Sequence, residues 1–335
     1  MSDMTPPTPG LNPKEVADFH NMLKQSKRIV AVLGAGISAS SGLATFRGTN
    51  GLWHGQDMMQ VATPAGFRRD PGLVWQFYAY RRHAALQARP NPAHYALAEL
   101  ARRVCPGCVT LTQNAQLKQL HGNLFDLCCF DAVGCGYVEK DNFKDPLTPA
   151  LDTTRDEAAA MGRIEPGSKP KANGMLLAGI ARKNAQILGE KGEEQPGARP
   201  RPMCDIRLSS GLSKEDLPQC PQCKANILRP SVVWFGEALA ESTAQEAEAL
   251  FAEDTEPIDL CLVIGTSSKV WPTAGYAEKA RKKGARIATV NIDAGDAKGL
   301  RPGKDWVFVG DAAQVLPELL KPVIGDPENW KRTGI

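Results

Sequence analysis

The sequence lacks the features that would place it among membrane, secreted or nucleic-acid-tethered proteins. No apolar run reaches the roughly 18–20 residues that cross a bilayer. The first residues show neither a charged-then-apolar secretion signal nor a clear mitochondrial presequence. A net charge of +3 over 335 residues suggests no dominant nucleic-acid contact. We therefore expect no membrane and no direct nucleic-acid binding, while a mitochondrial or a cytoplasmic or nuclear location stays open.

The cysteines are too few and too clustered for a small disulfide scaffold. The nine of them include three groups: Cys105 with Cys108; Cys128, Cys129 and Cys135; Cys220 with Cys223. Such clusters favour metal binding in a reducing compartment. Two thiolates spaced as in Cys220-x2-Cys223 form half of a tetrahedral zinc site. Cys105 and Cys108 have the same spacing, but they lie in a predicted helix-to-strand turn without a second pair, so we interpret them as incidental thiols.

Apolar runs alternate with helical patterns along most of the chain. Residues 29–33 form a continuous β-rich run after a helix that Asn12 and Pro13 begin. Similar apolar runs lie at 109–112, 232–235, 260–264 and 287–290. Helical patterns lie between these runs, at 71–88, 92–103, 241–252 and 273–283. This alternation predicts an α/β fold with a doubly wound, Rossmann-like parallel sheet.

One stretch interrupts the alternation and predicts a second, smaller unit. It holds two cysteine groups and a long middle part rich in Pro, Gly, Lys and Glu. We therefore expect a Rossmann-like domain formed by residues 1–125 and 225–335. Residues 126–224 would form an inserted zinc-binding module with a long loop.

A glycine-rich turn follows the first apolar run directly. Residues 34–39 read Gly-Ala-Gly-Ile-Ser-Ala and fit the G-x-G-x-x-G/A pattern of dinucleotide sites. Glycines let a backbone approach a diphosphate, although a tight strand-to-helix connection needs them too. The usual second strand with its terminal acidic residue is not visible in residues 41–53. We expect instead a loop that carries an aromatic residue and an arginine over the nucleotide.

Seven ordered blocks resemble the sirtuin family of NAD-dependent protein lysine deacylases over roughly residues 28–320. The blocks are Gly34–Ser38, Ser41–Gly48, Gly51–Trp53, Thr112–Asn114, His121-Gly122, Val233–Glu237 and Gly265–Ser268. The resemblance implies NAD as cosubstrate and acylated-lysine proteins or peptides as substrates. Its products would be nicotinamide, free lysine and O-acyl-ADP-ribose, and we expect a monomer.

The resemblance also assigns roles to single residues. His121 would be the base that deprotonates a ribose hydroxyl, and histidine suits this because its ordinary pKa is near 6.5; the alternative is an ordinary core or surface histidine. NAD would contact Gly34, Ala35, Gly36, Ser38, Phe46, Arg47, Trp53, Gln113, Asn114, Gly265, Thr266, Ser267, Asn291, Asp293 and Ala312. The substrate peptide would pair as an extra strand with Val233, Phe235, Gly236 and Glu237, which could equally be a buried strand and its exit turn.

The family's first zinc pair corresponds by position to Cys129 and Cys135, although five residues separate them instead of two. Cys128 competes with Cys129 for this role. With Cys220 and Cys223 the set would hold one structural Zn²⁺, which folds the inserted module and does no chemistry.

A tyrosine and an arginine in the helical pattern at 71–88 suggest the acyl group. Tyr78 and Arg81 are spaced i and i+3, hence lie on one helix face. A guanidinium and a phenol together can hold a carboxylate, and the pair is similar to that of class III sirtuins, which remove succinyl, malonyl and glutaryl groups. The alternative is a solvated helix in which Arg82 is the exposed partner.

The sequence departs from the family between Asn114 and His121. Only six residues intervene, which span about 9 Å as a helix, and the family's aspartate has no counterpart. A second hypothesis is therefore a catalytically impaired NAD- and acyl-peptide-binding protein. A third, a zinc-knuckle nucleic-acid binder, is disfavoured by the modest charge and by the lack of interleaved aromatics near the cysteines.

Overall fold

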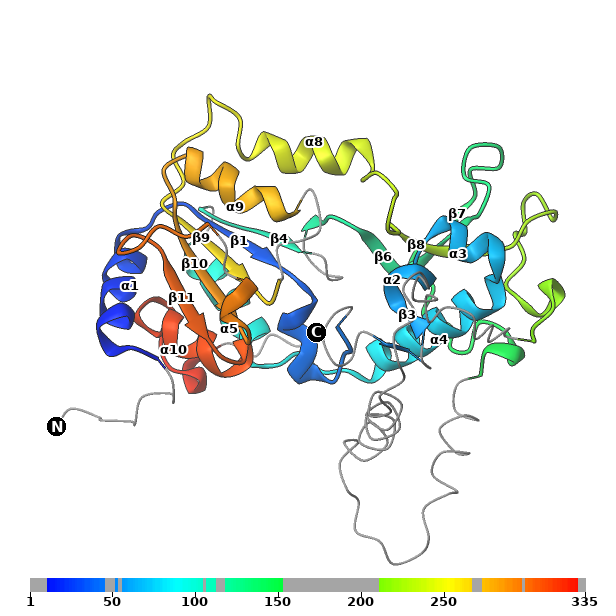
Figure 1. The fold of residues 1–335 in the computed structure, drawn as a ribbon, viewed down its shortest axis with the longest axis horizontal. Coiled ribbons are helices and arrows are strands. Elements are labelled where there is room, and N and C mark those ends of the chain that lie inside the picture. Colours follow the sequence, from blue (N-terminus) through cyan, green and yellow to red (C-terminus); the bar gives the residue numbers. More distant parts are fainter. Residues whose placement is uncertain are drawn as a thin grey trace, which may run out of the picture.

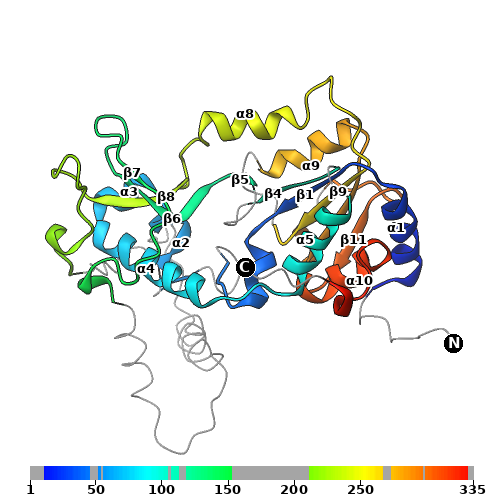
Figure 2. The same cartoon turned by 180° about the vertical axis from the view of Figure 1, so that it is seen from behind.

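The computed structural model describes residues 11–45, 52–53, 56–104, 107–112, 118–152, 211–266, 273–296 and 299–330. They form a larger lobe around a six-stranded sheet and a smaller lobe around a three-stranded sheet (Figures 1 and 2). Within these ranges, the helices are all too short or too polar to cross a membrane.

The larger sheet has the strand order of a doubly wound Rossmann-like fold. Its strands are β1 (Ile29–Leu33), β4 (Cys108–Thr112), β5 (Lys118–Gln119), β9 (Leu260–Ile264), β10 (Arg286–Asn291) and β11 (Trp306–Val309). All pairs are parallel, in the order β11-β10-β9-β1-β4-β5. Strands β4 and β5 are added on one side of β1, and β9, β10 and β11 on its other side, so the strand order changes direction between β1 and β9. Ligands of such sheets bind at the carboxyl ends of the strands beside this point. The predicted fold class is confirmed.

Helices cover both faces of this sheet. They are α1 (Pro13–Gln25), α5 (Pro92–Val104) and α10 (Ala312–Ile324) on one face, and α8 (Glu241–Ala249) and α9 (Thr273–Lys282) on the other (Figure 1). Alternate β1 residues enter two different cores: Ala31 packs with the first helix group and Val32 with the second. Burial on both faces explains why β1 reads as a continuous apolar run.

The smaller lobe combines an antiparallel sheet with three helices. The sheet has the order β7-β6-β8, and the elements are α2 (Met58–Val61), α3 (Pro64–Arg69), α4 (Pro71–Gln87), β6 (Gly122–Cys129), β7 (Val138–Glu139) and β8 (Leu228–Val232). One core joins Phe67 and Trp75 of the helices to Leu127 and Leu217. This lobe therefore extends beyond the predicted module at 126–224.

The remaining described elements are short. Two-residue strands β2 (Leu52–Trp53) and β3 (Gln56–Asp57) pair with each other, outside both larger sheets. The 3₁₀ turns are η1 (Ala35–Ser41), η2 (Pro149–Leu151), η3 (Lys214–Asp216), η4 (Ala294–Asp296) and η5 (Pro327–Asn329).

The strand predicted at 232–235 is wrong in both position and sheet. The observed strand β8 ends at Val232 and belongs to the smaller, antiparallel sheet. Residues 233–235 are apolar for a different reason: Trp234 is buried in the core of the smaller lobe, with Phe235 packed against it. An apolar run reports burial, but it does not say which sheet or core provides that burial.

Candidate active site

Two glycine-containing loops touch at the carboxyl ends of β1 and β9. The Gly36 N–H donates to the Gly265 carbonyl oxygen at 2.8 Å, and the Gly34 N–H donates to that of Ile264 at 2.9 Å. A Cβ on Gly34 or Gly36 would lie 2.4 or 2.6 Å from the Gly265 oxygen, and Gly265 itself has φ +58°. Any side chain would therefore separate the loops. The glycines are therefore needed for the close contact of the two loops, before any ligand is considered.

The other described residues of the predicted cofactor site follow the ends of neighbouring strands. The Ser38 hydroxyl lies 3.3 Å from His94 Nε2, and Asn291 Nδ2 donates to the Thr266 carbonyl at 3.0 Å. Asp293 is exposed beyond β10. Ala35 lies in η1, and Ala312 is buried at the start of α10. The residues predicted at 46, 47, 113, 114 and 267 lie outside the described residues, and Trp53 is described only as part of β2.

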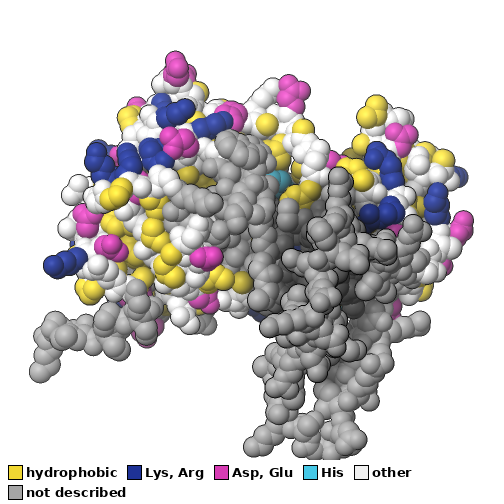
Figure 3. Space-filling view, in the orientation of Figure 1, with side chains coloured by type: hydrophobic (Ala, Val, Ile, Leu, Met, Phe, Trp, Pro, Cys, Tyr) yellow, Lys and Arg dark blue, Asp and Glu magenta, His cyan; other side chains and the backbone are white. Residues whose placement is uncertain are grey.

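His121 occupies the junction between the lobes. The preceding Leu120 is buried in a core of the larger lobe, and Leu127 is buried in that of the smaller lobe. The His121 carbonyl oxygen accepts the Val233 N–H at 2.8 Å. The space-filling view shows a histidine side chain at the surface between the two lobes (Figure 3). Sequence position and backbone pairing thus bring the predicted base beside the predicted substrate segment.

Burial sets the protonation of His121. Desolvation lowers the pKa of its imidazole below the ordinary 6.5, because a charged ring loses hydration. The ring is therefore neutral at pH 7 and can accept a proton. The glycine after it is required by the fold: Gly122 has φ +76°, and a Cβ there would lie 2.1 Å from the Ser231 carbonyl oxygen.

Residues 234–237 form a tight turn. The Glu237 N–H donates to the Trp234 carbonyl at 3.0 Å, and Gly236 has φ +89°, a conformation that favours glycine at the third position of such a turn. The Phe235 N–H donates to the Ala62 carbonyl at 3.0 Å. The predicted substrate segment is thus an exit turn from β8, held against the loop that precedes α3.

The Glu237 side chain is engaged within the chain. Its carboxylate accepts the Trp234 N–H at 2.8 Å and two guanidinium hydrogen bonds from Arg229, at 2.5 and 2.9 Å. No sequence motif assigns a role to Arg229. The available signal is an arginine that precedes an acidic residue by eight positions.

Tyr78, with Arg81 one helical turn later on α4, packs against this turn. Tyr78 is buried, and its ring stacks on that of Trp234 at a centroid distance of 6.3 Å. Burial raises the pKa of its phenol, which therefore stays protonated and able to donate. The Arg81 guanidinium donates to the Ala44 carbonyl at 3.2 Å, and burial lowers its pKa.

Arg82 is not the exposed partner that the solvated-helix alternative supposes. Arg82 is 1% exposed, and its guanidinium donates to the carbonyl oxygens of Leu124, Asn142 and Lys144. The side chain therefore fastens α4 to the 124–144 segment. Its burial reflects those three acceptors, which no local sequence pattern reveals.

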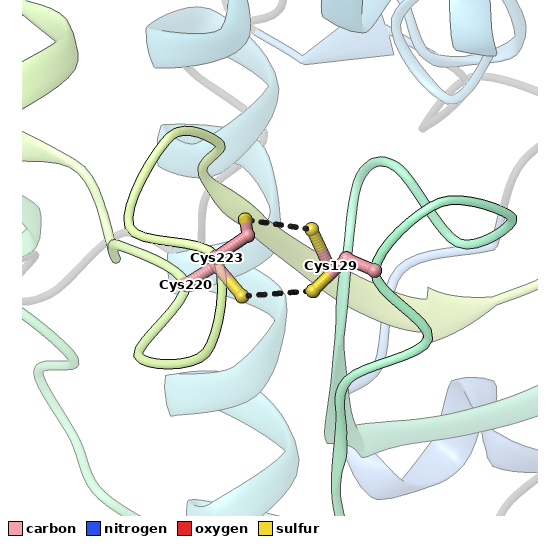
Figure 4. Close-up of side chains that lie close together, drawn as sticks. Cys129, Cys220 and Cys223 are labelled. Atoms are coloured by element: carbon pink, nitrogen blue, oxygen red, sulfur yellow. Dashed lines mark hydrogen bonds between the residues drawn. The ribbon is translucent and has the colours of Figure 1, made fainter.

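Four cysteines form one cluster in the smaller lobe (Figure 4). The Sγ atoms of Cys129, Cys135, Cys220 and Cys223 all lie within 4.8 Å of one another. The Cys129–Cys223 and Cys135–Cys220 separations are 3.8 and 3.6 Å. A tetrahedral zinc ion with Zn–S bonds of about 2.3 Å places its sulfurs about 3.8 Å apart. The cluster therefore fits a structural zinc, and Cys129, not Cys128, belongs to it.

Comparisons with known proteins agree with this arrangement. Residues 34–150 and 201–272 match the Sir2 family. An NAD-dependent protein deacylase of Candida albicans is 40% identical over 335 aligned positions, which cover 93% of this chain and 99% of the relative. The mitochondrial NAD-dependent protein deacylase sirtuin-5 of Canis lupus familiaris is 33% identical, over 92% of this chain and 85% of its own.

Solved structures give the same result at the level of the fold. A crystal structure of a Sir2 homologue in complex with NAD superposes with a TM-score of 0.62 and 27% sequence identity. The match covers 94% of this chain and 95% of the other.

Proposed function

Because this chain belongs to the Sir2 family, we propose that it is an NAD-dependent protein lysine deacylase. The observation that carries the proposal is the backbone hydrogen bond between His121 and Val233. It joins the predicted base to the predicted peptide segment. NAD would supply the ADP-ribosyl group that receives the acyl group as nicotinamide leaves.

The protein's own groups would bind, orient and accept a proton. The loops that meet at Gly36 and Gly265 would bind the diphosphate through their backbone N–H groups. The turn after β8 would position the acylated lysine, and the neutral imidazole of His121 would take the ribose proton. The four cysteines would keep the smaller lobe folded through zinc, at a distance from the reaction.

We further propose a preference for acidic acyl groups. Tyr78 and Arg81 support it, because a protonated phenol and a guanidinium are spaced i and i+3 on α4, and the Tyr78 ring stacks on Trp234 of the turn that would hold the lysine. A succinyl, malonyl or glutaryl carboxylate would accept hydrogen bonds from both groups, whereas an acetyl group offers them no charge.

The test is a nicotinamide-release assay with NAD and matched acetyl-, succinyl- and malonyl-lysine peptides. We expect kcat/KM for the acidic acyl peptides to exceed that for the acetyl peptide at least tenfold. Equal values would reject the preference and leave the deacylase intact. Absence of release from every peptide at high enzyme concentration would contradict the deacylase itself.

A second candidate function is binding of NAD and acyl peptide without turnover. One observation favours it: β5 runs parallel to β4, although only residues 113–117 join them. Parallel neighbours normally need a crossover of about 10–12 residues or more. Insertion of a family-length segment after Asn114 distinguishes the two functions. A gain of turnover from an inactive start supports the impaired protein, and unchanged turnover rejects it.

We also propose a monomer that acts on acylated proteins and does not bind nucleic acid. Light scattering and salt-dependent DNA-binding measurements test these two points. The relatives named sirtuin-5 are mitochondrial, and the name of the Candida albicans relative gives no location. A mitochondrial and a cytoplasmic or nuclear location therefore both stay open.

A further inference from the structure

Arg229 is a buried cation whose hydrogen bonds converge on the turn after β8. Its residue is 9% exposed. Nη1 and Nη2 donate to the two Glu237 carboxylate oxygens, and Nη2 also donates to the Val232 carbonyl at 2.7 Å. The guanidinium lies 3.4 Å from the centroid of the Trp234 ring. A bidentate pair stacked on an indole fixes orientation as well as charge.

The Glu237 carboxylate connects the end of the turn to its beginning. It accepts the N–H of Trp234, three residues earlier, at 2.8 Å. Burial by itself would raise the pKa of Glu237, but the hydrogen bonds from Arg229 and Trp234 outweigh it and hold the pKa below the ordinary value. The carboxylate is therefore ionised at neutral pH, as the bidentate pair requires.

Backbone groups hold the rest of the turn. The N–H groups of four residues are donated within the chain: Val233 to the His121 carbonyl, Trp234 to the Glu237 carboxylate, Phe235 to the Ala62 carbonyl and Glu237 to the Trp234 carbonyl. Of these four acceptors, only the carboxylate is a side chain. Arg229 and Glu237 are thus the groups through which substitution can loosen the turn while its backbone partners stay in place.

The same arginine connects the turn to the metal-binding sheet. Arg229 pairs in register with Cys128 on β6, and Cys129, the next residue, belongs to the cysteine cluster. Trp234, on which the guanidinium stacks, also packs against Tyr78. The ion pair between Arg229 and Glu237 thus links the three-stranded sheet to the turn, and through Trp234 to Tyr78.

We propose that Arg229 and Glu237 are positioning residues that hold residues 233–237 in the conformation that binds the acylated lysine peptide. The inference rests on the proposed function. It assigns Glu237 to the support of the turn and not to direct contact with substrate. Loss of the pair would weaken peptide binding, while the NAD crevice at Gly36 and Gly265 and the base at His121 stay in place.

Arg229→Lys tests this proposal, with Arg82→Lys as the matched control. Lysine keeps the charge but cannot donate a planar, bidentate pair. Arg82 is also buried in the same lobe, and its hydrogen bonds go to residues outside the turn. We expect Arg229→Lys to raise KM for the acyl peptide about tenfold or more, with KM for NAD within about twofold. Arg82→Lys should lower the melting temperature and leave KM for the peptide unchanged.

Conservative and radical changes at Glu237 give a second, ordered readout. Glu237→Gln keeps an acceptor for the Trp234 N–H and loses the ion pair, whereas Glu237→Ala loses both. Peptide affinity and amide hydrogen-exchange protection at Trp234 should therefore fall from wild type to Gln to Ala. The zinc content should stay at one per chain. If Arg229→Lys does not retain zinc, the Glu237 series decides the question.

Peptide binding measured by fluorescence anisotropy separates this proposal from the proposed function. Wild-type affinity and exchange protection in both Arg229→Lys and Glu237→Gln would overturn the positioning role, whatever the turnover. Weakened binding in these variants would support it even if the wild-type protein released no nicotinamide, an outcome that would contradict only the deacylase.

Discussion

The backbone carbonyl oxygen of His121 accepts the N–H of Val233 at 2.8 Å. This bond ties the start of β6 to the segment that leaves β8, at the point where the two lobes meet. Because the bond joins backbone atoms, it keeps Val233 beside His121 even when the side-chain contacts of the turn at 234–237 are lost. In a deacylase, the base and the peptide segment would approach the cofactor crevice together.

His121→Ala should remove turnover without unfolding the protein. The hydrogen bond to Val233 uses the backbone, so alanine retains it. Loss of a general base typically reduces the rate about 10²- to 10⁴-fold. We expect a fall of this size in kcat, with peptide affinity and zinc content unchanged. A kcat within about threefold of wild type would show that His121 is not the base.

The pH profile of kcat/KM should have its acidic limb below pH 6.5. Burial lowers the pKa of His121, so the ring stays neutral until the pH falls below that lowered value. Protonation then removes the acceptor, and activity is lost as the pH decreases further. The profile can be measured between pH 5 and pH 8 with a succinyl-lysine peptide. A limb centred above pH 7 would contradict the assignment.

Arg81→Met should change acyl selectivity more than overall activity. Methionine fills part of the same space and removes the cation that would bind a carboxylate. We expect KM for a succinyl-lysine peptide to rise about tenfold or more, because a charge-assisted pair is lost. The acetyl-lysine peptide is the internal control and should change less than about twofold. A parallel loss with both peptides would indicate a general packing role.

Cys223→Ser should release the metal, whereas Cys128→Ser should not. Cys223 belongs to the four-sulfur cluster, and Cys128, next to Cys129 on β6, does not. We expect elemental analysis to give one zinc per wild-type chain and per Cys128→Ser chain, and much less for Cys223→Ser. The latter should also unfold at a lower temperature, because zinc binding contributes to folding. Equal zinc contents in the two variants would contradict the assignment of ligands.

Gly36→Ala should destabilise the protein more than Gly42→Ala. A Cβ at Gly36 meets the Gly265 carbonyl oxygen at 2.6 Å, whereas one at Gly42 meets nothing within 4 Å. The Gly42 backbone has φ +86°, which costs an alanine about 1 kcal/mol. We expect the free energy of unfolding to fall by about 3 kcal/mol for Gly36→Ala and by about 1 kcal/mol for Gly42→Ala. A reversed order in chemical denaturation would show that the loops can separate at little cost.

The sequence predicts well those features that local pattern and composition specify. The apolar run at 29–33 and the glycines at 34 and 36 predict a buried parallel strand and a crowded turn, and the structure contains both. The spacing of Cys220 and Cys223 predicts half of a metal site, and the family resemblance, not the spacing, implies that Cys129 and Cys135 are the other half. These features depend on short stretches of chain, so they can be identified without knowledge of the tertiary fold.

Features that depend on distant partners could not be predicted in this way. The apolar residues at 233–235 indicate burial, but the partner that buries Trp234 comes from α3 and α4, about 160 positions earlier. The helices within 58–87 belong to the smaller lobe because they pack against residues of β6 and β8 that come much later in the chain. The ion pair of Arg229 with Glu237 depends on the turn at 234–237, which folds the acid back beside the arginine.

The cysteine cluster joins segments that are far apart along the chain, since Cys135 and Cys220 are 85 positions apart. A metal ion bound by the four cysteines would therefore hold together the two ends of the long segment between Cys135 and Cys220. Chain-closure entropy rises only slowly with length, by roughly 0.6 kcal/mol per doubling. Evolution can consequently lengthen or shorten the stretch between the two cysteine pairs at little thermodynamic cost, which makes it a tolerant place for new sequence.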